Sequence, residues 1–502
     1  MGFTAIFSAM EWSHLLWIVL GLIAGVVVGA LPGLNPSTGV AIMLPFTYEM
    51  NVSVALVFLC ALYCGAVYGG SISATLIGVP GTTSSAATVW DGHKMQLKGE
   101  GGKALGVATI ASTFGGVFGA ICLIIFTTPL ARVALAFGAP EYFAVSLFGL
   151  SIVARLAGEN IGKGLLSMLI GLLIATVGAD PFWAVPRFTF GISDLSGGID
   201  FMPVLIGAFA ISQVMSIVED GNYNNKYMAR IPKMREMIPS WKEFKSWLST
   251  MVRCSIIGTF IGVLPGAGAT IASFVTYNEG KRFSKHPELY GTGYTEAISA
   301  CESGNNSAAP GALVPLLALG IPGSGTSALL LTAFILHGLR PGPMLFSAQP
   351  ELVNTIYGGV LFANLLILVV GFLGIAFWSR VVNIPNNLLA IMVLILGMMG
   401  TYSVDYTMSS VLIMIFAGIL GVGMQKLKIP VAPMTLGIVL GFTMETNFRR
   451  ALIMGRGNIL IFFQRPISLF LIAVAILSVI SAFIPIKLKD IGKLFGKKAN
   501  NA

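Results

Sequence analysis

The sequence predicts an all-α polytopic membrane protein with about 12 membrane passes, arranged as two inverted repeats with Pro-Gly-broken or re-entrant helices. Three observations predict this class: an extreme apolar composition, a duplicated set of Pro-Gly pairs and an uneven distribution of basic residues. Of the 502 residues, 55% are hydrophobic and 10% are charged. Soluble domains carry roughly 25% charged residues, so a soluble fold is excluded.

Long apolar runs supply the predicted membrane helices, each of which needs roughly 20 residues. Met1 to Trp12 hold no Lys or Arg, so we expect the first run to be a retained anchor and not a cleaved signal peptide. Helices interrupted at Pro-Gly leave the count within roughly 10–14 passes. The clearest runs are 14–31, 104–128, 162–179, 352–377, 408–424 and 466–485.

Two pairs of related motifs interrupt these runs. Gly29-Ala-Leu-Pro-Gly33 recurs 233 residues later, and Gly78-Val-Pro-Gly81 recurs 242 residues later. Proline removes a backbone donor and glycine lets the chain change direction, so each motif should break a helix. Duplicated broken helices mark the binding site of many transporters. The predicted helix-break residues are Pro32, Gly33, Pro80, Gly81, Pro265, Gly266, Pro322 and Gly323.

The basic residues predict the topology. Seven of them lie between Asn222 and Arg253 against two glutamates, and the tail after Pro485 carries five lysines against one aspartate. The positive-inside rule places both segments in the cytoplasm. Since one extra helix, 466–485, lies between the second repeat and the tail, each repeat must then have an odd number of passes. Odd repeats that follow one another are inverted in the membrane, with the N-terminus outside. The predicted division is a first repeat 1–219, a basic cytoplasmic linker 220–251, a second repeat 252–445, an extra C-terminal helix region 446–485 and a basic cytoplasmic tail 486–502.

Polar residues that follow the breaks are the candidate substrate-binding residues. Pro36 suits the first turn of a new helix that Asn35 or Ser37 would cap, and a helix start binds carboxylate without a buried cation. Hydroxyls after the second breaks can bind an oxygen-rich ligand, or they can only satisfy the broken backbone. The carbonyls freed at the breaks are also suitable ligands for Na⁺. The candidates are Asn35, Ser37, Thr38, Thr83, Ser84, Asn305, Asn306, Ser324 and Thr326.

A further polar patch, Glu302-Ser-Gly-Asn-Asn-Ser307, precedes the apolar run 308–321. Its amides are interpreted either as cap and turn residues ahead of a helix or as the lining of a polar cavity. Glu302 is a candidate carrier of a coupling proton, because ionisable residues inside membrane proteins are costly and often functional. The four histidines are scattered without metal-ligand spacing, and no nucleotide-binding motif is evident.

These motifs together resemble the large membrane subunit of the tripartite tricarboxylate transporters, the TctA family, from about Ala24 to Phe442. After Asp91-Gly92 the sequence departs from the family pattern with His93-Lys94-Met95, which leaves the role of that loop open. The resemblance rests on Gly29-Ala-Leu-Pro-Gly33, Tyr68-Gly-Gly-Ser-Ile-Ser73, Pro80-Gly-Thr-Thr-Ser-Ser-Ala-Ala-Thr88, Gly262-Val-Leu-Pro-Gly266, Glu302-Ser-Gly-Asn-Asn306, Leu319-Gly-Ile-Pro-Gly-Ser324 and His337-Gly-Leu-Arg-Pro-Gly-Pro343.

The resemblance implies a secondary active transporter and not an enzyme: a multi-pass symport permease of the bacterial inner membrane that takes up a citrate-like di- or tricarboxylate. It implies a small membrane partner subunit and a periplasmic solute-binding protein that delivers the substrate. Coupling would be to a Na⁺ or H⁺ gradient, with no cofactor and no nucleic acid. The alternative is an anion channel with the same broken-helix architecture.

Overall fold

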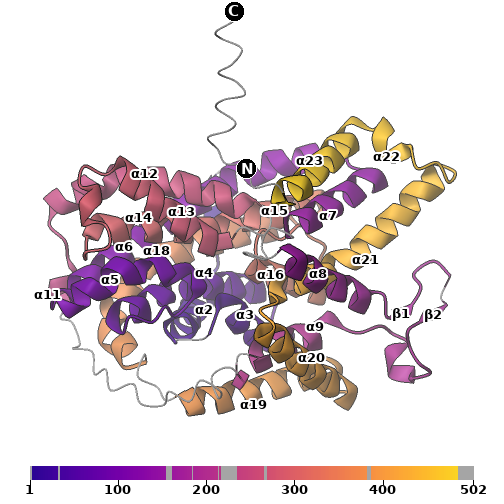
Figure 1. Cartoon of the computed structure of the whole chain (residues 1–502), viewed down its shortest axis with the longest axis horizontal. Coiled ribbons are helices and arrows are strands. Elements are labelled where there is room, and N and C mark those ends of the chain that lie inside the picture. The colour runs from indigo at the N-terminus through magenta and orange to yellow at the C-terminus, as the bar shows by residue number, and fades with distance from the viewer. Residues whose placement is uncertain are drawn as a thin grey trace, which may run out of the picture. The chain divides into compact units, whose positions relative to one another are not determined.

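The computed structural model is almost entirely helical (Figure 1). It describes residues 3–31, 34–153, 161–183, 185–212, 214–215, 234–264, 268–381 and 386–483. The chain forms two compact units, and each unit combines two separate stretches of sequence. Unit 1 comprises Met1–Ala136 and Ile199–Leu427, and unit 2 comprises Phe137–Gly198 and Lys428–Ala502.

Unit 1 contains both pairs of breaks. Its helices are α1 (Phe3–Ser8), α2 (Trp12–Ala30), α3 (Pro36–Met43), η1 (Pro45–Thr47), α4 (Val52–Leu76), η2 (Thr83–Ser85), α5 (Ala86–Leu97), α6 (Gly101–Ala134), α9 (Phe201–Leu205), η5 (Ile206–Ile211), α11 (Met234–Met237), α12 (Trp241–Val263), α13 (Gly268–Phe283), η6 (Pro287–Leu289), α14 (Thr295–Gly311), α15 (Leu313–Leu319), α16 (Gly325–Leu336), α17 (Pro343–Ala348), α18 (Pro350–Val381), α19 (Asn386–Asp405) and α20 (Met408–Lys426).

Unit 2 is a smaller helical bundle with one two-stranded hairpin. In the bundle, α8 packs antiparallel against α21, because Gly171 meets Met434 while Gly437 meets Met168. The hairpin strands pair Gly178 with Arg187. The elements are α7 (Ala139–Val153), α8 (Ile161–Ala175), β1 (Gly178–Ala179), β2 (Pro186–Arg187), η4 (Ser193–Leu195), α21 (Val431–Met454), α22 (Ile461–Gln464) and α23 (Pro466–Phe483).

Six helices in the described part of the chain are long and apolar enough to cross a membrane: α2, α4, α6, α12, α18 and α20. Four of them coincide with the clear apolar runs of the sequence, whereas α4 and α12 were not among those runs. The predicted spans 162–179 and 466–485 correspond to the shorter apolar helices Ile161–Ala175 and Pro466–Leu477. The prediction of an almost wholly helical protein with several helices long and apolar enough to cross a membrane is confirmed.

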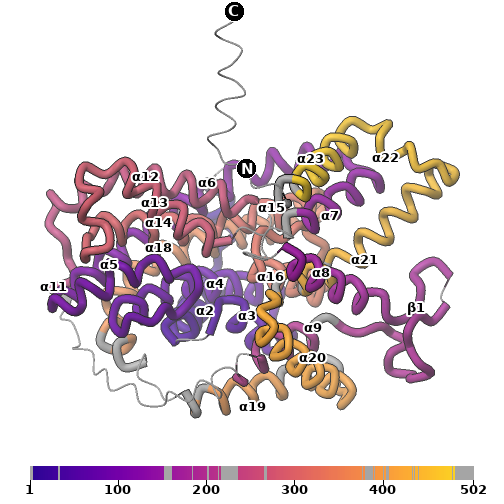
Figure 2. The backbone as a smooth tube through the Cα atoms, in the orientation of Figure 1, coloured from indigo at the N-terminus to yellow at the C-terminus, as the bar shows by residue number. Residues whose placement is uncertain are grey.

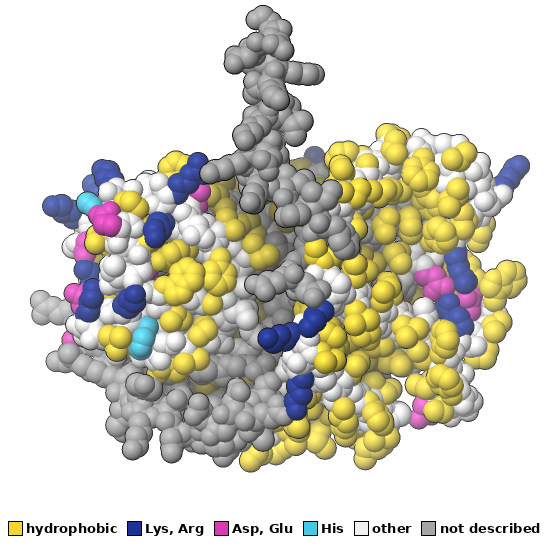
Figure 3. All heavy atoms as spheres, viewed as in Figure 1, with side chains coloured by type: hydrophobic (Ala, Val, Ile, Leu, Met, Phe, Trp, Pro, Cys, Tyr) yellow, Lys and Arg dark blue, Asp and Glu magenta, His cyan; other side chains and the backbone are white. Residues whose placement is uncertain are grey.

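The surface agrees with this class. Along α20, Leu412, Phe416 and Ile419 are exposed, while Val411 and Met414 face the protein. Figure 3 shows broad areas of hydrophobic side chains on the visible face. Exposed apolar area costs roughly 25 cal/mol per Å² in water, so these surfaces suit a lipid environment.

Close contacts at glycines show the relative directions of neighbouring helices in unit 1. α2 and α4 lie side by side (Figure 2) and run parallel. Between them, α3 and η1 must return the chain to the end where α2 began. Absent side chains let the two backbones approach closely, as is common between membrane helices. The successive contacts are Gly21 with Phe58, Gly25 with Leu62 and Gly29 with Ala66.

The second half of the sequence repeats this arrangement with α12 and α14. These helices also run parallel, and α13 returns the chain between them. α6 packs parallel to α14 on another side. The contacts that fix these directions are Gly258 with Gly304, Gly262 with Ala308, Gly115 with Ser303 and Gly119 with Ser307.

The two groups of helices run in opposite directions. α18 is parallel to α4, because Gly359 meets Val57 and Gly371 meets Tyr68. α6 is antiparallel to α18, since Gly116 meets Asn364 while Gly371 meets Thr109. Helices α2, α4 and α18 therefore begin at one end of unit 1, and helices α6, α12 and α14 begin at the other.

Candidate functional site

The two breaks of each half pack against one another. A Cβ atom on Gly81 would clash with the carbonyl oxygen of Gly29, and one on Gly323 would lie 2.6 Å from the carbonyl oxygen of Gly262. These glycines permit the same close approach in both halves. The predicted break residues Pro32, Gly33, Pro265 and Gly266 lie outside the described residues.

The chain turns at the second breaks through a left-handed glycine in each half. Gly78 has φ +72° and Gly320 has φ +70°, and each stands two residues before the break proline. A β-carbon disfavours this backbone conformation, so glycine suits both positions. Both segments then start a new helix, η2 leading into α5 in one case and α16 in the other.

Hydroxyl groups bridge the breaks of opposite halves. The Ser37 and Thr326 hydroxyls share a hydrogen bond of 3.0 Å, and the Thr83 and Thr270 hydroxyls share one of 2.8 Å. The first bond joins the start of α3 to the start of α16. The second joins η2, at the start of α5, to the first turn of α13. A Cβ atom on Gly268, at the start of α13, would lie 3.5 Å from the Cβ of Ser324, which caps α16, so the four helix starts meet within unit 1, two from each half of the sequence.

This junction is a favourable environment for an anion. Each helix start carries unpaired backbone N–H groups and a partial positive charge. The Thr83 side chain is exposed, Ser37 and Thr270 are half-buried, and Thr326 is buried. We call these four residues the junction of helix starts; it reaches the surface at Thr83.

Some hydroxyls satisfy the broken backbone instead. The Ser324 Oγ accepts the N–H of Ser327 at 3.1 Å, and the Ser327 Oγ accepts the N–H of Ser324 at 2.7 Å. This reciprocal cap closes the start of α16. Ser324 Oγ also lies 3.3 Å from the Tyr63 hydroxyl. The interpretation that hydroxyls satisfy the broken backbone therefore applies to Ser324 and Ser327.

The predicted amides lie inside α14, and this corrects one expectation. Asn305 and Asn306 were interpreted as possible cap and turn residues ahead of a helix, but α14 runs from Thr295 to Gly311 and buries both. Asn305 Nδ2 donates to the Ser84 carbonyl at 3.2 Å, which ties α14 to the second break of the first half. The Ser84 Oγ lies 2.9 Å from the Thr82 Oγ1.

Glu302 is the centre of a fully buried polar cluster. Its carboxylate accepts hydrogen bonds from the Thr88 hydroxyl and, at 3.0 Å, from the Ser112 hydroxyl. Asn305 and Asn306 also donate to it, at 3.4 and 3.3 Å. A buried carboxylate is costly unless it is hydrogen-bonded, and these four donors stabilise it. We call these five residues the Glu302 cluster.

Two predicted residues stand apart from these networks. Asn35 begins α3 without a capping bond from its side chain, and Thr38 is buried in the same helix. Within the described part of the chain, neither side chain is hydrogen-bonded to another of the candidates.

The structure adds four polar residues that the sequence analysis did not select: Tyr63, Thr88, Ser112 and Thr270. Thr270 could have been found, because it stands in the second half where Ser37 stands in the first, at the spacing of 233 residues. Ser112 lies in the middle of an apolar run, and only the packing of α6 against α14 reveals its role.

The Asp91-Gly92 motif has a connecting role. Asp91 is fully buried in α5 and accepts the Tyr277 hydroxyl at 2.8 Å. It also accepts the N–H groups of Gly293 at 2.8 Å and Tyr294 at 2.9 Å, in the loop before α14. Asp91 therefore fastens a first-half helix to a second-half loop.

Comparisons with known proteins agree with the motifs. Residues 15–436 match the family model of the tripartite tricarboxylate transporter TctA family. An uncharacterized 52.8 kDa protein in the TAR-I ttuC′ 3′ region of Agrobacterium vitis is 38% identical over 478 residues, which are 95% of each chain. A protein in the TAR-II ttuC′ 3′ region of the same organism is 37% identical over 228 residues, 45% of this chain and 94% of the relative.

No solved structure matches the chain. The family match and the relative that shares nearly the full length carry the assignment by themselves. The chain belongs to the tripartite tricarboxylate transporter TctA family, a family of membrane transporters and not of enzymes.

Proposed function

We propose that this protein is the permease subunit of a secondary active transporter that takes up a citrate-like di- or tricarboxylate. The observation that carries the proposal is the junction of helix starts, where two pairs of hydroxyls bridge opposite halves. Several helix starts in one place can bind a polycarboxylate through backbone N–H groups and hydroxyls, without a buried cation.

The two halves are inverted repeats that contribute to about 12 passes. The directions of the helices support this: α2 and α4 run opposite to α12 and α14, their counterparts at the spacings of the duplicated motifs. α6 and α18, which follow in each half, are likewise opposed. The proposal keeps the boundaries of the repeats, the linker and the tail that the sequence predicts. Inverted repeats that meet at broken helices are a recurrent architecture of secondary transporters.

A Na⁺ or H⁺ gradient drives uptake. The Glu302 cluster favours H⁺ as the coupling ion, because a carboxyl group enclosed by neutral hydrogen-bonding groups can exist in both protonation states. The backbone carbonyls at the breaks support Na⁺ as the alternative coupling ion. The protein needs no cofactor in this scheme.

The partners follow from the family. Tripartite transporters combine a large membrane subunit with a small membrane subunit and a periplasmic solute-binding protein. We propose the same for this protein, in a bacterial inner membrane, with the binding protein delivering the carboxylate.

The test is uptake of radiolabelled citrate into proteoliposomes that contain both membrane subunits, with the binding protein outside. An imposed Na⁺ or pH gradient should drive accumulation above equilibrium, and Glu302→Gln should abolish accumulation driven by a pH gradient. Glu288→Gln, at an exposed carboxylate, is the control. Passive equilibration with no accumulation would instead indicate the anion channel, and uptake that requires ATP would overturn the proposal.

A further inference from the structure

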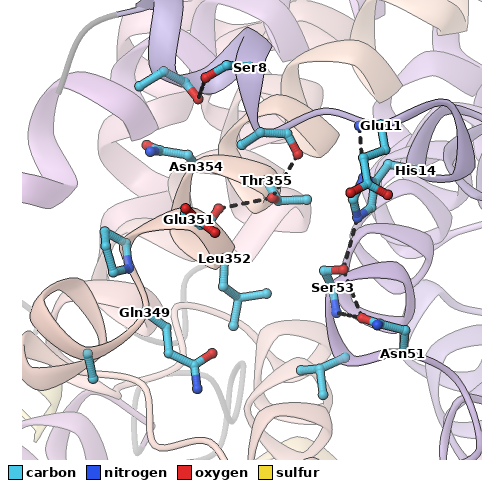
Figure 4. A pocket seen from close by; sticks show the side chains of 15 residues that line it. Ser8, Glu11, His14, Asn51, Ser53, Gln349, Glu351, Leu352, Asn354 and Thr355 are labelled. Atoms are coloured by element: carbon cyan, nitrogen blue, oxygen red, sulfur yellow. Dashed lines mark hydrogen bonds between the residues drawn. The ribbon is translucent and has the colours of Figure 1, made fainter.

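A polar pocket of about 800 Å³ lies in unit 1 away from the junction of helix starts (Figure 4). It forms where three parallel helices begin. Glu11 and His14 come from the start of α2, Asn51 and Ser53 from the start of α4, and the segment Ala348–Thr355 from the end of α17 and the start of α18. None of the fifteen lining residues is Lys or Arg. We call this cavity the rim pocket.

In the wall of the rim pocket, the protons of His14 and Ser53 are already used in hydrogen bonds within the wall. The backbone N–H of Glu11 donates to His14 Nδ1 at 3.1 Å, so the ring proton sits on Nε2. Nε2 then donates to the Ser53 Oγ at 2.9 Å, and that hydroxyl donates to the Asn51 Oδ1 at 3.0 Å. The direction of each bond in this chain is fixed, and the imidazole and the hydroxyl have no proton left for a ligand.

One buried acceptor in the pocket is unpaired among the described residues. Asn354 lines it with only 7% of its surface exposed, and its Oδ1 has no hydrogen-bond partner among the described residues. A buried acceptor without a donor costs roughly 1–3 kcal/mol, so this oxygen favours an incoming N–H group. Glu11 and Glu351 are exposed and also line the pocket, Glu11 beside His14 (Figure 4).

The shape and charge of the rim pocket restrict its occupant. The three helix starts add a partial positive charge of about half a unit each, but a carboxylate substrate would also meet the two full negative charges of Glu11 and Glu351 and no cationic side chain, so it is disfavoured. One water takes about 30 Å³ of liquid volume, so the cavity is far larger than a bare metal ion needs. A segment of a partner protein that presents a long cationic side chain with several N–H donors can fill this volume and matches the charge.

The side of the membrane on which the rim pocket lies indicates which protein can supply that side chain. It lies where α2, α4 and α18 begin, at the end of unit 1 opposite to the start of α12. The basic segment leads directly into α12, and the positive-inside rule places that end in the cytoplasm. On this topology the rim pocket opens to the periplasm.

We propose that the rim pocket is a docking socket for a Lys or Arg side chain of the periplasmic solute-binding protein. Glu11 and Glu351 pair with its charge, and the Asn354 Oδ1 accepts one of its N–H groups. This inference rests on the proposed function, which supplies the partner. Charge pairs at the rim of an interface mainly set the association rate and its salt dependence.

The experiment titrates the binding protein that supports wild-type uptake against the full-length protein in nanodiscs. The variant is Glu11→Gln combined with Glu351→Gln, which keeps the side-chain shape and the backbone bond of Glu11 to His14. The dissociation constant should rise roughly 2- to 30-fold, as expected for two partly exposed ion pairs. Uptake at saturating binding protein should be unchanged, and the salt dependence of binding should weaken.

Glu49→Gln is the matched control, because this exposed carboxylate precedes α4 on the same end but does not line the pocket. Carbodiimide, which joins a carboxylate directly to an amine, should link Glu351 or Glu11 to a lysine of the binding protein when lysine is the occupant.

Equal affinity of the variant and wild type would overturn the inference alone. So would a carbodiimide link from these glutamates to a second copy of this chain. Wild-type uptake that needs no binding protein would overturn the proposed partner as well.

Discussion

At the scale of single residues, the structure separates hydroxyls that bridge the two halves of the sequence from hydroxyls that cap helices. Thr326 lies in the first turn of α16 and bonds to Ser37 across the junction. We expect Thr326→Ala to raise the substrate concentration for half-maximal uptake roughly 10- to 100-fold, since a hydrogen bond to a charged group contributes about 1.5–3 kcal/mol. Thr326→Ser should retain most of the affinity.

The control is Lys242→Ala, at an exposed position of α12 near the basic segment, which should leave uptake unchanged. The amides have their own test. Wild-type transport by the combined Asn35→Ala and Asn305→Ala variant, at normal expression, would exclude both from the substrate site.

At the scale of elements, the breaks themselves were predictable, because proline and glycine act through their own backbone chemistry wherever they stand. The surroundings of the breaks were not. Asn305 and Asn306 allowed cap and turn residues ahead of a helix, yet α14 runs from Thr295 to Gly311 and packs against α6 and α12. Two of the four partners of Glu302, Thr88 and Ser112, come from α5 and α6, which no local pattern connects to it.

Close packing of the breaks predicts opposite effects for two alanine substitutions. A Cβ on Gly323 would lie 2.6 Å from the Gly262 carbonyl oxygen, so Gly323→Ala must push backbone apart. Gly423, in α20, has open space around it, and Gly423→Ala should stabilise the helix by about 0.5–1 kcal/mol. Thermal unfolding in detergent should give a lower midpoint for Gly323→Ala and an equal or higher midpoint for Gly423→Ala. The same shift in both variants would contradict the packing.

The hydrogen bonds that backbone N–H groups of the loop before α14 donate to α5 have Asp91 as their acceptor. Its carboxylate faces donors only, namely one hydroxyl and the backbone N–H groups of Gly291, Gly293 and Tyr294. Asp91→Asn would turn an N–H donor toward some of these groups, at a cost of roughly 1–3 kcal/mol. We expect a lower unfolding midpoint and faster proteolysis between Leu289 and Tyr294. Unchanged proteolysis would show that other contacts hold the loop.

At the scale of the whole molecule, the opposed directions of the two helix groups and the charge distribution make one joint prediction about topology. α2 and α4 begin at the end of unit 1 where Glu49 lies, and α12 begins at the other end, beside the basic segment. We therefore expect the N-terminus in the periplasm and both the 222–253 segment and the tail after Pro485 in the cytoplasm.

Cysteine labelling tests this arrangement in a background without the five native cysteines. A maleimide that does not cross the inner membrane should label Glu49→Cys in intact cells. It should label Lys242→Cys and Lys493→Cys only after permeabilisation, because the charged segments that carry them do not cross the bilayer. If Lys242→Cys and Lys493→Cys are labelled from opposite sides, each repeat has an even number of passes. The two repeats would then not be inverted, and the opposite directions of their helices would need another explanation. The argument that inverted repeats form an anion site at the junction of helix starts would also fail.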